Sequence, residues 1–218
     1  MKLSARLTAL CQSISKNEFQ HIWDCCCDHG YLGQQLMTDH PNSQVHFVDV
    51  VPHLISEVED RLNASTNSLA NNWAVHCMDA ATIRLDDKQS HLVIIAGVGG
   101  DLLIEMVSSI VSHHSELMLN RKLDFILCPV RQLHKVRTGL NALKLGLVSE
   151  QIVEENNLFY EVIHVSNQSD KAVSLVGEAM WDLSNPAHVS YQQTMIRHYE
   201  KQPSDVAKQL LALYQGIL

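Results

Sequence analysis

Four aspartates in the first part of the chain stand where apolar runs end, and this placement suits the binding of a nucleotide. Asp24 and Asp28 lie four residues apart after one run, and Asp49 and Asp79 close two later ones. A carboxylate at the end of a strand can accept the hydroxyl hydrogens of a ribose or a hydrogen of an adenine amino group. The alternative is that Asp49 and Asp79 cap loops or helices. Because three successive runs end in aspartate, we favour binding.

A glycine-rich junction follows later, where the apolar run 92–96 passes into Gly97-Val98-Gly99-Gly100-Asp101. The stretch from Asp24 to Leu32 has a similar design, with an apolar run, a turn and then a helical pattern. In an open α/β sheet, ligands bind in the crevice beyond the carboxyl ends of such strands. Two of these ends side by side would form one pocket.

Alternating strands and helices are predicted to hold these residues along one edge of a sheet. Extended apolar runs occupy 19–26, 44–49, 73–78, 90–96 and 123–128, and helical periodicity occupies 3–14, 30–39, the segment after Pro52, 101–113 and 132–145. Gly146 is expected to cap the last of these helices. Residues 63–72 are expected to form a polar loop.

The rest of the chain predicts a β-hairpin and then two helices. Residues 147–154 and 160–166 flank the turn signal Glu155-Asn156-Asn157, and two later apolar stripes meet near Pro203. The fold class is therefore α/β, with a doubly wound, mostly parallel seven-stranded sheet and a small C-terminal helical hairpin. We expect residues 1–166 to form the ligand-binding domain, and residues 167–218 to form a linker and the hairpin.

The composition limits the functions that the chain can have. It has 218 residues, 46% of them hydrophobic, and a net charge of −8 with histidine neutral. That charge argues against a surface that grips nucleic acid everywhere, but a confined basic patch is compatible with it. Candidates for such a patch are Lys2, Arg6, Arg131, Lys135, Arg137, Arg197, Lys201 and Lys208. Without a signal peptide or an apolar run that could span a bilayer, we expect a cytoplasmic protein.

Cys25-Cys26-Cys27 and the 13 histidines pose the question of a metal or redox site. Metal ligand sets space their cysteines so that both sulfurs face the ion, whereas neighbours in a strand point to opposite faces. No histidine pair has a convincing metal spacing. We therefore expect buried free thiols and no metal.

The order and spacing of these motifs resemble one family, the bacterial tRNA adenine-22 N1-methyltransferases, from Leu3 to about Val165. The matching motifs are Leu3-Ser4-x-Arg6-Leu7, Asp24-x-x-x-Asp28-His29-x-Tyr31-Leu32, Ala96-Gly97-x-Gly99-Gly100 and Phe159-Tyr160-Glu161. One glycine turn would be weak evidence, but the series at matching separations is strong. The resemblance implies the Rossmann-like class I methyltransferase fold, S-adenosylmethionine as cofactor and tRNA as partner.

The resemblance also implies roles for individual residues. Asp24, Asp28 and Tyr31 would border the cofactor, Asp49 would bind its ribose, and Asp79 would approach its adenine. The predicted cofactor-binding set is Asp24, Asp28, His29, Tyr31, Leu32, Asp49, Asp79, Ala96, Gly97 and Gly99.

The chemistry would be transfer of the sulfonium methyl group to N1 of adenine, which has its own lone pair. The predicted catalytic residues are Asp28 and Asp101, because either could stabilise the positive charge that the base acquires. The base must leave its stack to be reached, and Tyr31, His29 or Phe159 could then stack on it.

The chain departs from the family at two positions. Cys26 stands where the family has glycine, and its Cβ restricts the approach of a ligand to the backbone. Cys128-Pro129-Val130 stands where the family has Gln-Pro-Asn, so an amide that could bind the base is missing; Arg131, Gln132 or His134 could replace it. These departures leave two alternatives, a methyltransferase of this fold with a small-molecule or protein acceptor, and a binding module without turnover.

Overall fold

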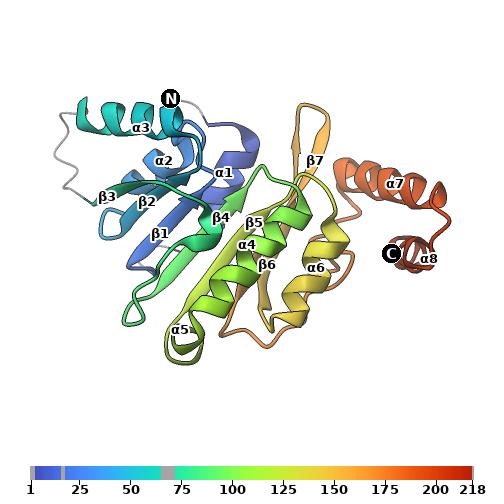
Figure 1. Ribbon diagram of the computed structural model, residues 1–218. Helices are drawn as coiled ribbons and strands as arrows, with labels where there is room; N and C mark the ends of the chain where they lie inside the picture. The colour runs from blue at the N-terminus through green and yellow to red at the C-terminus, as the bar shows by residue number, and fades with distance from the viewer. Residues whose placement is uncertain (1–2, 16–17, 65–71, 218) are drawn as a thin grey trace.

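Seven strands form a single sheet through the middle of the molecule (Figure 1). The computed structural model describes residues 3–15, 18–64 and 72–217. The strands are β1 (His21–Cys25), β2 (Gln44–Asp49), β3 (Trp73–Cys77), β4 (His91–Ala96), β5 (Leu123–Cys128), β6 (Gly146–Glu155) and β7 (Leu158–Ser166). Their order is β3-β2-β1-β4-β5-β7-β6, and β7 is antiparallel to both of its neighbours. The prediction of a doubly wound, mostly parallel seven-stranded sheet is confirmed.

The strand order reverses between β1 and β4. The chain moves outward from β1 through β2 to β3, and then returns to place β4 on the other side of β1. Strand β1 is parallel to both β2 and β4. At such a reversal the connections after the two central strands go to opposite faces of the sheet, so a crevice opens beyond their carboxyl ends.

Helices cover both faces of the sheet. Those on one face are α1 (Ala5–Gln12), α2 (Tyr31–Asp39) and α3 (Pro52–Ala64), and those on the other are α4 (Gly100–His113), α5 (Ser115–Asn120) and α6 (Leu133–Ala142). In β4, Leu92 and Ile94 belong to the first core, and Val93 and Ile95 belong to the second. This burial on both faces explains the nearly uninterrupted apolar run of β4.

Helix α6 ends earlier than the sequence predicted, and Gly146 is not its cap. The helix stops at Ala142, and the left-handed residue that follows it is Lys144, with φ of 57°. Gly146 instead begins β6, at a point where a Cβ would come within 2.0 Å of the Ser169 carbonyl oxygen. Glycine is needed there for the close approach of the following segment, so the predicted cap was wrong. Helix α5 was not predicted.

The β-hairpin was predicted correctly. Asn156 and Asn157, between β6 and β7, have φ of 54° and 60°, the left-handed values that a two-residue turn of type I′ requires. The predicted polar loop 63–72 falls mostly on residues 65–71, which lie outside the described residues, and Asn63 belongs to α3. Among the described residues, no helix is long and apolar enough to cross a membrane.

The predicted C-terminal pair of helices is also present. Helices α7 (Pro186–Glu200) and α8 (Asp205–Gln215) lie at one side of the molecule, next to α6 and the start of β7 (Figure 1). The side chains of Asn185 and Ser204 cap them by accepting backbone hydrogen bonds. Strand β7 ends at Ser166, where the two predicted domains would meet, but the division itself stays a prediction.

Candidate functional site

A cleft of about 320 Å³ opens beyond the carboxyl ends of β1 and β4. Helix α1, the turn between β1 and α2, and the loop after β4 line it with Arg6, Leu7, Asp24, Cys25, Cys26, Cys27, Asp28, His29, Tyr31, Leu32, Ala96, Gly97 and Val98. Its volume is within the range of small-molecule sites, and its place is the reversal of strand order.

The structure brings many of the predicted cofactor residues together in this cleft. Those in its lining are Asp24, Asp28, His29, Tyr31, Leu32, Ala96 and Gly97. The other predicted cofactor residues, Asp49, Asp79 and Gly99, lie at neighbouring strand ends and loops, outside the lining, and so does Asp101, which was predicted to be catalytic. The predicted pocket therefore exists, but some of the residues predicted for it lie outside its lining.

Asp24 is the buried acid of the cleft. It is the fourth residue of β1, its exposed fraction is 3%, and its carboxylate accepts a hydrogen bond of 2.8 Å from Gly33 N in α2. The net pKa of Asp24 is raised to about 7: burial raises it most, the hydrogen bond from Gly33 lowers it, and the negative charge of Asp49 raises it. Near neutral pH this carboxyl therefore exchanges readily between neutral and charged forms.

The turn between β1 and α2 adopts a backbone that favours glycine. Cys26, Asp28 and Gly30 have φ of 58°, 51° and 67°, all in the left-handed region. A side chain with Cβ is strained in this region, although aspartate tolerates it better than cysteine does. Cys26 thus keeps the conformation that suits the glycine of the family motif, while its thiol lines the cleft.

Asp49 and Asp79 both make the local hydrogen bonds of capping residues. Asp49 accepts from Asp28 N at 3.1 Å and from Val51 N at 3.0 Å, and Asp79 accepts from Ala81 N at 2.9 Å. Asp49 thereby fixes the turn that carries Asp28. A carboxylate oxygen has two lone pairs, so these bonds leave acceptor capacity for a ligand.

The negative charges of this region converge on Cys26. Burial first, and then the charges of Asp49, Asp24 and Asp79, together raise the pKa of the Cys26 thiol to about 11. The aspartates at the ends of the three strands are thus all close enough to act on the Cys26 thiol.

The loop after β4 forms the other wall of the cleft, and the loop after β5 holds this wall in place. Gly97 N donates to Cys128 O at 3.1 Å, and Val130 N donates to Val98 O at 3.0 Å, so the loop after β4 is tied to the loop after β5. Gly97 has φ of 81°, and a Cβ at this position would meet no atom within 4 Å. The missing side chain therefore leaves open space beside the lining residues.

Asp101 supports the same wall from outside. Its carboxylate accepts from Lys135 Nζ at 2.8 Å and from Gln132 Nε2, and both partners belong to the segment after β5. Gly99 lies beneath Arg131, since a Cβ there would come within 2.9 Å of the Arg131 Nε.

A family model described as a methyltransferase domain matches residues 3–163. The chain belongs to this methyltransferase family. The match covers α1, the cleft and nearly all of the sheet.

Individual relatives extend the likeness beyond the family model. A Mycoplasma pneumoniae protein named as a tRNA methyltransferase is 22% identical over 205 residues, which are 90% of this chain and 87% of that protein. The crystal structure of the B. subtilis m1A22 tRNA methyltransferase is 20% identical, with a TM-score of 0.74, and covers 98% of this chain and 94% of its own. An M. capricolum homologue of it, in complex with S-adenosylhomocysteine, is 15% identical, with a TM-score of 0.76, and covers 100% and 96%.

Arg6 lines the cleft, although from the sequence it was predicted only to contact RNA. Its guanidinium lies 4.8 Å from the centre of the Tyr160 ring, and its backbone N–H donates to Glu155 Oε2 at 2.8 Å. The Arg6 Nε is buried and has no hydrogen-bond partner among the described residues. An unpaired donor in a cleft calls for an acceptor on the ligand, and the motif Leu3-Ser4-x-Arg6-Leu7 was the only signal for it.

The three aromatic candidates for stacking on a base have different surroundings. Tyr31 is 38% exposed at the cleft, and the Arg61 guanidinium lies 5.1 Å from its ring centre. His29 lies beside it, with ring centres 5.7 Å apart. Phe159 is outside the cleft lining and stacks on Tyr191 of α7 at 5.1 Å.

The predicted cations do not all face solvent. Arg137 is fully buried in ion pairs with Glu150 and Glu161, so the prediction that it contacts RNA was wrong. Lys135 and Lys208 are exposed but pair with Asp101 and Asp205. Arg131, Arg197 and Lys201 are exposed, and their contact with RNA stays a prediction; Lys2 lies outside the described residues.

The cysteine cluster consists of free thiols, as predicted. All six cysteines are unpaired, and burial raises the pKa of Cys25, Cys26 and Cys27 above the ordinary value. Protonated thiols are poor metal ligands and poor nucleophiles. Among the described residues, no group of three or more histidine, cysteine or acidic side chains could hold a metal ion.

Proposed function

We propose that the protein transfers the methyl group of S-adenosylmethionine to N1 of an adenine in tRNA. One observation supports this acceptor above the others: the structures of tRNA m1A22 methyltransferases match the chain over nearly its whole length, C-terminal hairpin included. The hairpin contributes nothing to the lining of the cleft. The hairpin is common to this chain and to those enzymes, and we attribute it to a common methyl acceptor, because binding the cofactor does not require it.

The cleft has the donors and acceptors that this cofactor requires. The carboxyl of Asp24 would hold the amino group of the methionine part, and the unpaired Nε of Arg6 would bind its carboxylate. Asp49 would accept from the ribose hydroxyls, and Asp79 from the adenine amino group. The open space at Gly97 gives room for the cofactor against the backbone.

The reaction requires no nucleophilic side chain from the protein. S-Adenosylmethionine supplies an electrophilic methyl group on a sulfonium, and adenine N1 has a lone pair in the neutral base. The chain must therefore hold N1 in line with the methyl group, exclude water and stabilise the charge that the base acquires. Asp28 suits the last task, since it lines the cleft and its side chain is 71% exposed. Asp101 is already paired with Lys135, so we assign it to holding the wall of the cleft.

The target adenine must leave its stack before N1 can be reached. Tyr31 presents a half-exposed ring at the cleft, and the Arg61 cation against it limits its motion. We propose Tyr31, with His29 beside it, as the platform for the extruded base. We also place the reaction in the cytoplasm, because free thiols fit a reducing compartment.

A methyltransferase of this fold with a small-molecule or protein acceptor is the second candidate. The net charge of −8 and Val130 in place of an amide favour it. Incubation with methyl-labelled S-adenosylmethionine and bulk tRNA, followed by nucleoside analysis, separates the two. We expect label in 1-methyladenosine, and at least about tenfold less of it with the Asp49→Ala variant at limiting cofactor. Label that appears only in protein or in small molecules would contradict the proposal.

A further inference from the structure

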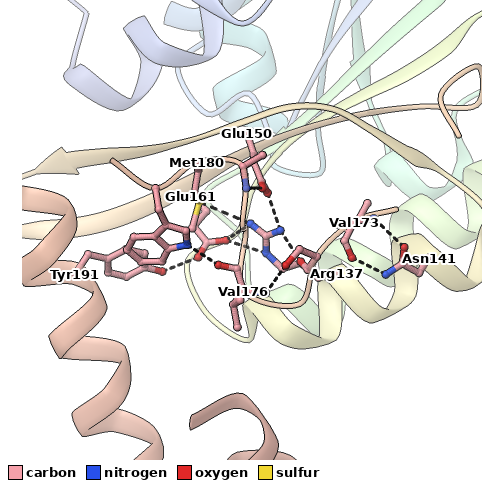
Figure 2. Close-up of polar contacts among 11 residues, drawn as sticks. Arg137, Asn141, Glu150, Glu161, Val173, Val176, Met180 and Tyr191 are labelled. Atoms are coloured by element: carbon pink, nitrogen blue, oxygen red, sulfur yellow. Dashed lines mark hydrogen bonds and ion pairs between the residues drawn. The ribbon is translucent and has the colours of Figure 1, made fainter. Parts of the chain in front are cut away.

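One buried guanidinium ties together the sheet, the linker after it and the C-terminal hairpin (Figure 2). Arg137 of α6 donates to Glu161 Oε2 of β7 from Nε at 3.0 Å and from Nη2 at 2.6 Å, and to Glu150 Oε2 of β6 from Nη1 at 2.7 Å. Nη1 also donates to Ser174 O at 2.8 Å, and Nη2 approaches Met180 Sδ at 3.8 Å. The Arg137, Glu150 and Glu161 side chains are all 0% exposed.

Tyr191 is the contribution of α7 to this network. Its hydroxyl donates to Glu161 Oε1 at 2.8 Å, so the carboxylate holds Arg137 with one oxygen and the hairpin with the other. The Tyr191 ring lies between Phe159 of β7 and Trp181 of the linker, with ring centres 5.1 Å and 5.5 Å away. We call Glu161 and Tyr191 the latch.

Apart from the latch, the hairpin packs mainly on itself and on the linker. Its buried core consists of Val176, Tyr199, Ala207, Leu210 and Tyr214, and none of these residues belongs to the sheet. A small apolar joint resists rotation weakly, because apolar contacts have no preferred direction. The hydrogen bond from Tyr191 to a buried carboxylate is directional, and it therefore helps to fix the angle between the hairpin and the sheet.

The linker is fastened to the same point. Ala179 N donates to Glu150 Oε1 at 2.9 Å, and the Asn141 side chain exchanges hydrogen bonds with Val173 N and O at 3.0 Å and 2.7 Å (Figure 2). A Cβ on Gly177 would come within 2.7 Å of Arg137 Nη2. The linker thus approaches the hairpin along a path set by Arg137 and its neighbours.

The angle of the hairpin decides where its cations stand. Burial and the charges of Lys135 and His198 lower the pKa of His134, and Asp101 raises it, so the last turn of α7 lies within electrostatic reach of the start of α6. Arg197 and Lys201 are exposed at that end of α7. The start of α6 follows the loop after β5, which is hydrogen-bonded to the cleft wall formed by the loop after β4 and in which Arg131 is exposed.

We propose that the Glu161–Tyr191 latch positions the hairpin so that Arg197 and Lys201 meet the phosphates of an RNA whose target base enters the cleft. This inference rests on the proposed tRNA acceptor. Tyr191 is a positioning residue, since it touches neither the cofactor cleft nor the reacting atoms. With the latch open, only a fraction of the molecules would have the hairpin at the productive angle, and the apparent affinity for RNA would fall by that fraction.

The test uses the full chain with Tyr191→Phe, which removes the hydroxyl and keeps the ring. We expect the KM for tRNA to rise roughly tenfold, and kcat and the Kd for S-adenosylmethionine to change by less than about twofold. Tyr199→Phe is the matched control, because it removes a hydroxyl from the hairpin core and leaves the latch bond in place; it should behave as wild type. Hydrogen exchange should speed up in the Tyr191→Phe variant within residues 174–200 and stay unchanged in the sheet.

Each other outcome overturns the inference. A tRNA KM equal to wild type, despite faster exchange in the hairpin, would show that its angle does not matter for the acceptor. Equal losses in tRNA and cofactor affinity, or the same loss with Tyr199→Phe, would reveal a general loss of structure. If the wild type methylates no tRNA, the proposed function itself fails and the acceptor part of the inference fails with it; hydrogen exchange then still shows separately whether the latch bond holds the hairpin.

Discussion

The cofactor cleft and the joint of the hairpin place charged groups in opposite ways. In and beside the cleft, the carboxylates of Asp24 and Asp49 accept hydrogen bonds from backbone N–H groups, and the side chain of Asp28 is exposed. At the joint, Arg137 uses its donors on two carboxylates, a carbonyl and a sulfur within the chain. The cleft keeps acceptors for a ligand, whereas at the joint both carboxylates and the guanidinium find their hydrogen-bond partners within the chain.

This difference determines what each region contributes. Unbalanced negative charge is unfavourable in the free protein, and a cationic ligand relieves it. A satisfied buried ion network has little affinity left for a ligand, but it fixes the geometry of the segments that supply it. The cleft is therefore the region that binds, and the joint is the region that orients.

Removing the hairpin is the strongest way to test this division. A chain that ends at Gly177 keeps every residue of the cleft lining and loses Tyr191 with both helices. We expect S-adenosylmethionine affinity within about twofold of the full chain, and tRNA methylation reduced by at least about 100-fold, as for a misplaced substrate. Isothermal calorimetry and methyl transfer measure the two quantities.

Thermal unfolding serves as the control for this truncation. If the hairpin only covers an apolar face, the shortened chain aggregates or melts much lower before any specific defect appears. A soluble, stable truncation that methylates tRNA at the full rate would place acceptor recognition in the sheet domain alone.

The cleft should respond to Asp49→Ala with a loss of cofactor affinity. Removing hydrogen bonds to a charged acceptor costs about 1.5–3 kcal/mol, which is roughly 10-fold to 150-fold in Kd. Part of that loss comes through Asp28, whose N–H donates to Asp49. Asp60→Ala, an exposed acid of α3, is the control with the same change in charge. Equal affinity of the Asp49 variant in calorimetry, with the fold intact, would remove Asp49 from the site.

The sequence predicted the cleft well and the joint poorly, for a physical reason. Asp24, Asp28 and Tyr31 lie within one strand-turn-helix segment, so their spacing alone indicates a shared site. Glu161 was noticed only as part of a family motif, and Tyr191 was not singled out. The latch joins residues far apart in the chain, and a single charged residue in a helix such as Arg137 carries no local sign that it is buried.

The left-handed conformation of Cys26 was also not predicted from the sequence. Cys26 was known to stand where the family has glycine, but the only consequence predicted was that its Cβ leaves less room for a ligand. Gly146 shows the reverse error, because a glycine after a helix was interpreted as a cap when a crowded backbone required it. Helix and strand boundaries within the periodic segments were predicted within a few residues, since burial on one or both faces determines them.

The titration of Asp24 makes the cleft sensitive to pH, and the joint should not share this sensitivity. If the cationic ligand needs the charged carboxylate, and the pKa of Asp24 is about 7, cofactor affinity should rise about tenfold from pH 6 to pH 8. Asp24→Asn should bind more weakly and show a flat profile over this range. Calorimetry at several pH values checks it, and a wild-type profile that falls with pH would contradict it.

The same group gives a signed prediction for stability. The folded state of Asp24 holds a proton between about pH 4 and 7 that the unfolded state releases, so its contribution to stability falls as pH rises through this window. His46 and His91 act in the opposite sense, because burial lowers their pKa values to about 3 and about 4, and their contribution is lost as pH falls below about 6.5. Asp24→Asn should therefore lose more stability than wild type between pH 7 and pH 5, by roughly 2 kcal/mol.

The smallest expected effect is that of Cys26→Gly, and it bears on the chemistry of the cleft alone. Glycine accepts φ of 58° without the strain of a Cβ, so the variant should gain about 1 kcal/mol in free energy of unfolding, although its unfolded chain is more flexible. With more room beside the ligand, S-adenosylmethionine should bind equally well or more tightly. Lys144→Gly, at φ of 57° and far from the cleft lining, is the matched control and should gain stability with no change in cofactor binding. If Cys26→Gly abolished binding in a folded protein, the thiol would itself contact the ligand, and the cleft would need its cysteine as much as its carboxylates.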